Sequence, residues 1–118
     1  MSKLSDIVYD TIRKVLPGLR ITKEYYIRYK NKKLFFDFHI ADLGLLVEVQ
    51  GRQHVMFVKH FHGEKEKFLE QQHRDNLKIE YAENNNKAFV RFYYDEKITE
   101  ELVMMRFNKV FDKENIYE

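Results

Sequence analysis

The chain has 118 residues, of which 44% are hydrophobic and 15% aromatic, enough to bury one core in a single domain spanning residues 1–118. It has no cysteine, which excludes a disulfide framework and a thiolate metal site, and no apolar run approaches the roughly 20 residues of a membrane helix. The net charge of +2 is too small to indicate nucleic-acid binding by itself. Because the first residues also lack the apolar core of a signal peptide, we expect a soluble, cytoplasmic protein.

The first two predicted elements are a helix and a strand. Residues 3–16 carry apolar side chains at helical spacing, and Pro17 and Gly18 stop that pattern. Residues 19–29 are rich in aromatic and β-branched side chains, which favours a strand, and residues 30–32 can turn the chain.

The next two predicted strands, 34–40 and 45–50, are joined by a short connection at residues 41–44. In the first strand, alternation predicts one face made of Leu34, Phe36, Phe38 and Ile40, with Asp37 on the opposite face. In the second, Glu48 shares a face with Leu46 and Gln50, and the other face is made of Leu45, Val47 and Val49.

The remainder of the chain is predicted to form a long helix, a strand and a final helix. Residues 63–84 contain good helix formers and end at an Asn-rich turn at 84–86, and residues 88–94 follow as a strand. Thr99, followed by two glutamates, is typical of a helix N-cap, and the last helix extends to about residue 111. This order predicts an α/β sandwich of two or three layers, with a central mixed sheet flanked by helices.

Asp37 and Glu48 are the residues most indicative of chemistry. A carboxylate in the middle of a buried strand is costly unless a counter-charge accompanies it. If the hairpin register brings the two acids together, a divalent cation such as Mg²⁺ or Mn²⁺ would relieve their repulsion and could assist phosphodiester hydrolysis. Alternatively, each acid pairs with a lysine or lies at the rim of the sheet.

A family resemblance rests on these acids and the residues around them. The segment FDFHIADLGLLVEVQGRQH resembles the core of the PD-(D/E)XK nuclease superfamily, in the branch of very-short-patch-repair and phage homing-type endonucleases. The matching positions are Asp37, Glu48, Gln50, Gly51, Gln53 and His54. The likeness continues along the long helix and covers roughly residues 33–95; its further positions are Phe61, Gly63, Phe68, Gln71, Gln72, Arg74, Asp75, Lys78 and Tyr81.

The resemblance implies a restriction-endonuclease-like fold and a Mg²⁺ site, with Mn²⁺ as a substitute, held by Asp37, Glu48 and the backbone carbonyl of Val49. It also implies a lysine at position 50, where this chain has Gln50, which carries no charge.

His54 is the candidate for the missing proton transfer, with Gln53 to orient it or the phosphate; a histidine that merely caps the strand is the alternative. Asp75 and Lys78 either support the site or form a structural ion pair. The additional acid that the first helix of such enzymes often supplies would be Asp6 or Asp10, and both fit the pattern loosely.

Basic and histidine side chains near these motifs are candidates for contact with a nucleic-acid backbone. They are Lys32, Lys33, Arg52, Lys59, His60 and His62. Ordinary solvated lysines are the alternative. A zinc site built from the histidines is disfavoured because no cysteine is present to complete it.

These inferences predict a Mg²⁺-dependent DNA endonuclease, encoded by a phage or another mobile element and active in the host cytosol. The alternatives are a catalytically degenerate DNA-binding module on the same fold and a structure-specific or RNA-processing nuclease. DNA is the expected partner, and specificity would come from a homodimer or a separate targeting domain.

Overall fold

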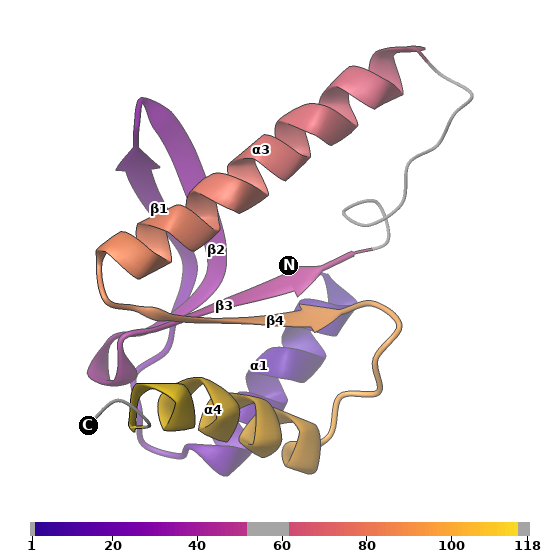
Figure 1. Cartoon of the computed structure of the whole chain (residues 1–118). Helices are drawn as coiled ribbons and strands as arrows, with labels where there is room; N and C mark the ends of the chain where they lie inside the picture. The colour runs from indigo at the N-terminus through magenta and orange to yellow at the C-terminus, as the bar shows by residue number, and fades with distance from the viewer. Residues whose placement is uncertain (1, 52–61, 116–118) are drawn as a thin grey trace.

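The computed structural model describes residues 2–51 and 62–115. Figure 1 shows their arrangement along the chain. The elements are α1 (Lys3–Val15), β1 (Thr22–Tyr29), β2 (Lys32–Ile40), the short 3-10 helix η1 (Ala41–Leu43), β3 (Leu45–Gln50), α3 (His62–Asn84), β4 (Ala88–Tyr93) and α4 (Glu100–Asn115). Their order confirms the predicted one, with most ends within two residues; β1 starts three residues later and α4 extends four residues further than predicted.

The four strands form one mixed sheet in the order β1-β2-β3-β4. The first three strands are antiparallel neighbours, and β4 runs parallel to β3 after the chain has crossed over through α3. Lys30 and Asn31 have positive φ angles of 49° and 64°, as a two-residue hairpin turn between β1 and β2 requires. The predicted mixed sheet is therefore confirmed.

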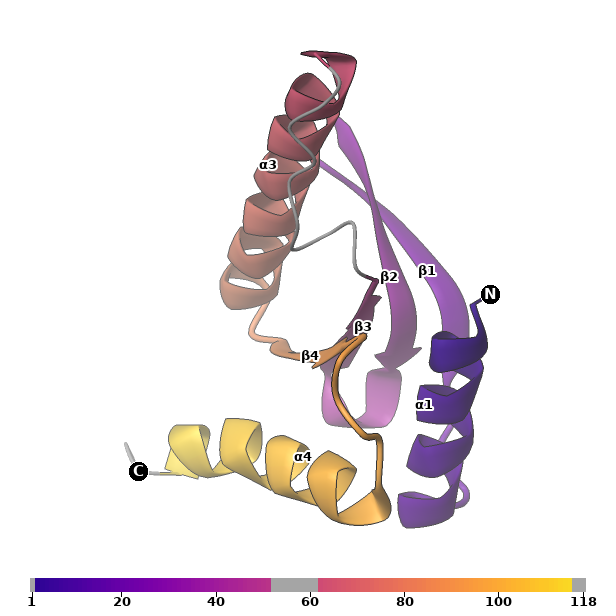
Figure 2. The same ribbon diagram turned by 90° about the vertical axis from the view of Figure 1, so that its right-hand side faces the viewer.

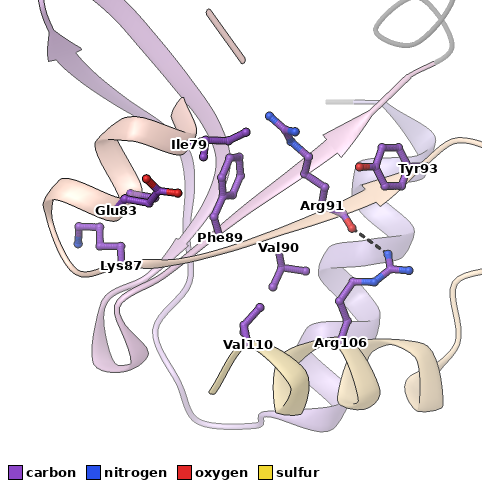
Figure 3. A pocket seen from close by; sticks show the side chains of 10 residues that line it. Ile79, Glu83, Lys87, Phe89, Val90, Arg91, Tyr93, Arg106 and Val110 are labelled. Carbon is purple, nitrogen blue, oxygen red and sulfur yellow. Dashed lines mark hydrogen bonds between the residues drawn. The ribbon is translucent and has the colours of Figure 1, made fainter. Parts of the chain in front are cut away.

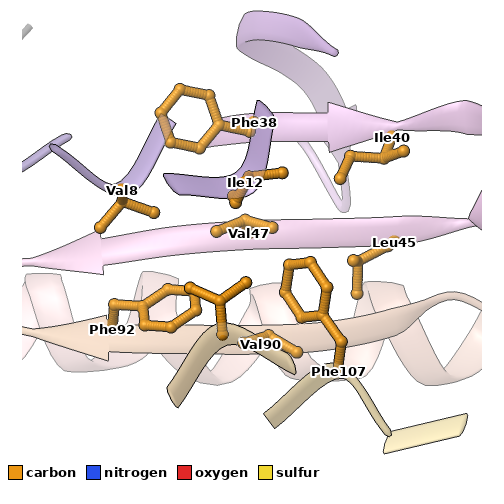
Figure 4. Close-up of a cluster of buried hydrophobic side chains, with 10 residues drawn as sticks. Val8, Ile12, Phe38, Ile40, Leu45, Val47, Val90, Phe92 and Phe107 are labelled. Carbon is orange, nitrogen blue, oxygen red and sulfur yellow. The ribbon is translucent and has the colours of Figure 1, made fainter. Parts of the chain in front are cut away.

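The sheet lies between two layers of helices. Helix α3 covers one face, and α1 and α4 cover the other, as the view in Figure 2 shows. The larger core, on the α1 and α4 side, includes Val8, Ile12, Phe38, Val47 and Phe107 (Figure 4). A smaller core on the α3 side contains Leu34, Phe36, Leu46, Leu77 and Ala82. Of the two predicted sandwiches, the protein has the three-layer form.

Side-chain caps fix the starts of α1 and α4. The Ser2 hydroxyl accepts a hydrogen bond from the backbone N–H of Ser5 at 3.1 Å. The Thr99 hydroxyl accepts one from the N–H of Leu102 at the same distance, so the predicted N-cap of the last helix is confirmed. Within the described ranges, no helix is both long enough and apolar enough to cross a membrane.

Strand β2 does not keep the strict alternation predicted for it. Leu34 and Phe36 belong to the core under α3, whereas Phe38 and Ile40 belong to the core on the opposite face. The prediction that all four share one face is therefore wrong. The pattern breaks at Asp37, where the regular pairing of β2 with β3 ends and the Asp37 side chain, in place of a backbone carbonyl, accepts the N–H of Val49. The predicted division of β3 is confirmed, because Leu46 packs under α3 and Leu45, Val47 and Val49 pack on the other face.

Candidate active site

Asp37 and Glu48 meet where β2 separates from β3. The last backbone pair between β2 and β3 before the strands separate is Phe38 with Val47. Continuing the same register by one residue places Asp37 opposite Glu48. The Asp37 Oδ2 atom lies 2.7 Å from the backbone nitrogen of Val49, which fixes the carboxylate beside Glu48. Both acids are largely buried, with 8% and 2% of their surface exposed. Carboxylates at this depth require partners.

Helix α3 supplies a cation to this pair of acids. The Lys78 Nζ atom donates to Glu48 Oε2 at 2.7 Å and lies 4.0 Å from Asp75 Oδ1 on the same helix. Gln71, one turn before Asp75, donates to the same carboxylate at 3.3 Å. The spacing of Gln71, Asp75 and Lys78 places the three side chains on one face of the helix, directed at the sheet. Lys78 is only 5% exposed, so its ion pair with Glu48 is a buried one.

Burial dominates the electrostatics of Glu48. Loss of hydration raises the pKa of its carboxyl group from 4.5 to about 7, even though the ammonium of Lys78 lowers it. The charges of Asp37 and Asp75 contribute smaller increases. A buried carboxyl group whose pKa is raised by neighbouring carboxylates belongs to a donor set that a divalent cation would stabilise, and hard oxygen ligands suit Mg²⁺. Asp37 and Glu48 therefore fit the cation that the resemblance implies.

The raised pKa of Glu48 predicts a pH-dependent stability of the metal-free protein. Between pH 4.5 and about 7 the unfolded chain loses this proton while the folded chain keeps it, so the free energy of unfolding falls as the pH rises. The contribution of this group amounts to as much as about 3 kcal/mol. Urea unfolding in EDTA at pH 5 and pH 7.5 measures it. Glu48→Gln should flatten this part of the profile, whereas Glu66→Gln, an exposed control on α3, should leave it unchanged; equal slopes in both variants would contradict the assignment.

The buried acids open into a cavity of about 290 Å³. Its lining combines two acids with three cationic side chains and a carboxamide: Lys33, Leu34, Phe35, Asp37, Glu48, Val49, Gln71, Arg74 and Lys78. The cations surround the acids, so a phosphate group entering the cavity would meet positive charge next to a place for a metal ion. Such a site is suited to phosphodiester chemistry.

The sequence-predicted residues are distributed as follows. Asp37, Glu48, Val49, Lys33 and Lys78 all line the cavity, and Asp75 contacts Lys78. Gln50 and Asp75 line a neighbouring polar cavity, and Lys32 lines a third cavity together with Arg74. Asp6 and Asp10 are exposed on α1, which packs on the opposite face of the sheet from α3.

The other candidates fall in or beside the segment that the structure does not describe. Arg52, Gln53, His54, Lys59 and His60 lie outside the described residues, and His62 is the first residue of α3. In the described ranges, no group of three or more histidine, aspartate or glutamate side chains is arranged to hold a metal. A site of two carboxylates and the Val49 carbonyl does not require such a group.

Sequence reasoning missed Arg91. This residue pairs in register with Glu48 across β3 and β4, and its Nη2 atom donates to the backbone oxygen of Asp75 at 3.3 Å. A charge within the otherwise apolar strand segment AFVRFYY is the same kind of signal that identified Glu48.

Another cavity, of about 530 Å³, lies along the outer edge of β4. Figure 3 shows Arg91 leaving β4 toward α3 while Arg106 approaches from α4 and donates to the Arg91 carbonyl at 2.8 Å. Glu96 forms an ion pair with Arg106 and accepts the N–H of Tyr93, so these two side chains occupy part of the strand edge. This cavity contains neither Asp37 nor Glu48, and its size does not make it the site of chemistry.

The fold and the site define a class: a three-layer α/β protein with a buried carboxylate and lysine cluster between its sheet and α3. Comparison with known proteins adds one relative, "Uncharacterized protein 307L" of Invertebrate iridescent virus 6, 40% identical over 67 residues. The match covers 57% of this chain and 34% of the viral protein, so the chain corresponds to about a third of that relative. No family profile matches the chain, and no solved structure matches it.

Proposed function

We propose that this protein is a divalent-metal-dependent endonuclease that hydrolyses phosphodiester bonds in DNA. The observation that carries the proposal is one cavity in which Asp37 and Glu48 lie together, with Lys78 bonded to Glu48 and with Lys33 and Arg74 on the wall. Buried acids with a lysine beside a basic wall suit binding of a metal ion and a phosphate in the same place.

In this proposal Asp37, Glu48 and the backbone carbonyl of Val49 hold Mg²⁺, for which Mn²⁺ can substitute. A divalent ion bound there would polarise the phosphate and lower the pKa of an attacking water. The N–H of Val49 keeps the Asp37 carboxylate oriented toward Glu48. The positive charges of Lys33 and Arg74 would attract and hold the negatively charged phosphate.

Lys78 would supply the positive charge that Gln50 cannot. The resemblance places a lysine two residues after Glu48, but the ammonium next to Glu48 in this fold comes from α3. It would offset the negative charge that develops on the phosphate as the bond breaks. His54, with Gln53 beside it in sequence, remains the proposed proton-transfer group.

The likeness to a viral protein supports a viral or mobile-element origin. A nuclease of that origin would act in the host cytosol. So small a domain offers little surface for recognition, and a homodimer or a separate targeting domain would contribute the remainder.

The test is cleavage of supercoiled plasmid and of single-stranded RNA by the purified protein with Mg²⁺, with Mn²⁺ and with EDTA. We expect metal-dependent relaxation of the plasmid and slower cleavage of RNA. RNA cut faster than DNA would instead establish an RNA-processing nuclease. A folded protein that binds DNA but cuts neither substrate would overturn the enzymatic proposal in favour of a binding module, in which Lys78 and Glu48 are only a structural pair.

A further inference from the structure

A second polar cavity adjoins the candidate active site. It measures about 300 Å³ and is lined by Gln50, Gln72, Asp75, Asn76 and Arg91. Gln50 follows Glu48 by two residues on the same face of β3, a spacing of about 6–7 Å. Asp75 stands between the two cavities, since it lines this one and lies 4.0 Å from Lys78 in the other.

One buried polar atom on the wall of this cavity has no hydrogen-bond partner among the described residues. It is the Arg91 Nε atom. Gln50, on the same wall, is only 4% exposed. Because a buried donor without a partner is unfavourable, its position at the wall of a polar cavity indicates a place for a polar ligand.

Arg91 is nevertheless held firmly in position. Its guanidinium donates to the Asp75 carbonyl, and its central carbon lies 4.9 Å from the centroid of the Phe89 ring. Figure 3 shows the side chain extending from β4 toward α3, away from Arg106. The free donor is therefore pre-oriented, which reduces the entropic cost of binding a ligand.

The chemistry of the lining favours a neutral planar ligand over a second phosphate. The cavity holds one cation, Arg91, and one carboxylate, Asp75, which would repel an anion. Its other three side chains are carboxamides, each offering both a donor and an acceptor. This combination matches the hydrogen-bonding edge of a nucleobase, for which glutamine, asparagine and arginine are the usual partners.

We propose that this cavity binds the base of the nucleotide next to the cleaved phosphodiester and gives the enzyme a base preference at that position. The inference rests on the proposed nuclease function, because it takes its ligand from the nucleic acid bound at Asp37 and Glu48. Gln50 is buried and Arg91 is partly buried in this recognition surface, and Gln72 and Asn76 on α3 form its exposed part.

The test is binding in EDTA, where no cleavage occurs, of fluorescein-labelled DNA homopolymers of A, C or T and of an abasic strand. We expect the dissociation constants of the wild type for its tightest-bound and weakest-bound homopolymers to differ by about tenfold or more. The double variant Gln72→Ala/Asn76→Ala alters only exposed positions, and its discrimination should fall below about threefold while its affinity for the abasic strand stays equal to that of the wild type. Asn108→Ala, exposed on α4, is the matched control and should discriminate as the wild type does.

Discrimination that persists in the double variant, or that is absent from the wild type, would overturn the proposal. Because these measurements need no catalysis, they separate it from the nuclease proposal. If the wild type discriminates between bases, the double variant does not, and neither protein cleaves DNA, the base-binding cavity would be supported and the nuclease proposal contradicted. If the wild type cleaves plasmid but does not discriminate between bases, the nuclease proposal would be supported and the base-binding cavity contradicted.

Discussion

Asp37→Asn is expected to reduce the rate of Mg²⁺-dependent plasmid cleavage by about 10³-fold or more, which corresponds to about 4 kcal/mol of activation free energy. The substitution removes the negative charge from the proposed metal site but keeps the shape of the side chain. The amide oxygen of asparagine can still accept the N–H of Val49 that Asp37 accepts at 2.7 Å. The fold should therefore persist, and the free energy of unfolding should change by about 1 kcal/mol or less.

The matched control for this variant is Asp42→Asn. Asp42 is exposed in η1 and outside the site cavity, so the same change of charge there should leave cleavage within about twofold of wild type. Single-turnover cleavage and urea unfolding of both variants provide the comparison. If Asp37→Asn cleaved as fast as Asp42→Asn, Asp37 would not be a metal ligand.

The second large effect is expected at Lys78. Lys78→Met keeps the length of the side chain but leaves Glu48 buried without its ammonium partner, and breaking one side of a buried pair is strongly destabilising. We expect the free energy of unfolding at pH 7.5 to fall by about 2–4 kcal/mol. Without the ammonium the pKa of Glu48 rises above about 7, so the loss should be smaller at pH 5, where the carboxyl group is protonated in both proteins.

Removing both partners separates the structural role of Lys78 from its proposed catalytic one. The double variant Glu48→Gln/Lys78→Met contains no unpaired buried charge and should recover much of the stability, but it should not recover cleavage. Lys67→Met, an exposed site on the same helix, is the control and should behave as the wild type. A stable Lys78→Met protein that cleaves at the wild-type rate would show that this lysine has neither role.

Local patterns in the sequence were sufficient for the order of the elements and for most of their ends. Pro17 and Gly18 end α1, Thr99 caps α4, and the residues between β1 and β2 turn the chain as expected. These features depend on neighbours along the chain, where propensity and capping act. The alternation of β3 was likewise sufficient to place Glu48 on the face opposite Val47 and Val49.

The break in β2 could not be predicted in this way. Leu34, Phe36, Phe38 and Ile40 are equally apolar, and nothing in their spacing indicates that two of them face α3 and two face away. The division arises because the Asp37 side chain takes a backbone hydrogen bond from Val49 on the next strand, a contact between residues 12 positions apart.

The pairing of Glu48 with Lys78 also could not be predicted from the sequence, because α3, which carries Lys78, lacks a simple apolar stripe. The buried positions of α3 include Asp75 and Lys78 as well as Leu77 and Ala82, so periodicity did not show which face would meet the sheet. Only the packing of α3 across β3 brings Lys78 to Glu48, 30 residues away in the chain. The same packing brings Arg91 next to Asp75.

Local sequence patterns therefore predicted the order of the elements and the two candidate acids, because a charge inside an apolar strand is conspicuous among its neighbours. Three features could be seen only in the folded chain: both acids share one cavity, their lysine comes from α3 and not from position 50, and a second polar cavity adjoins them. These features depend on contacts between distant segments, which form only when burial of the apolar faces of the sheet fixes the helices against it.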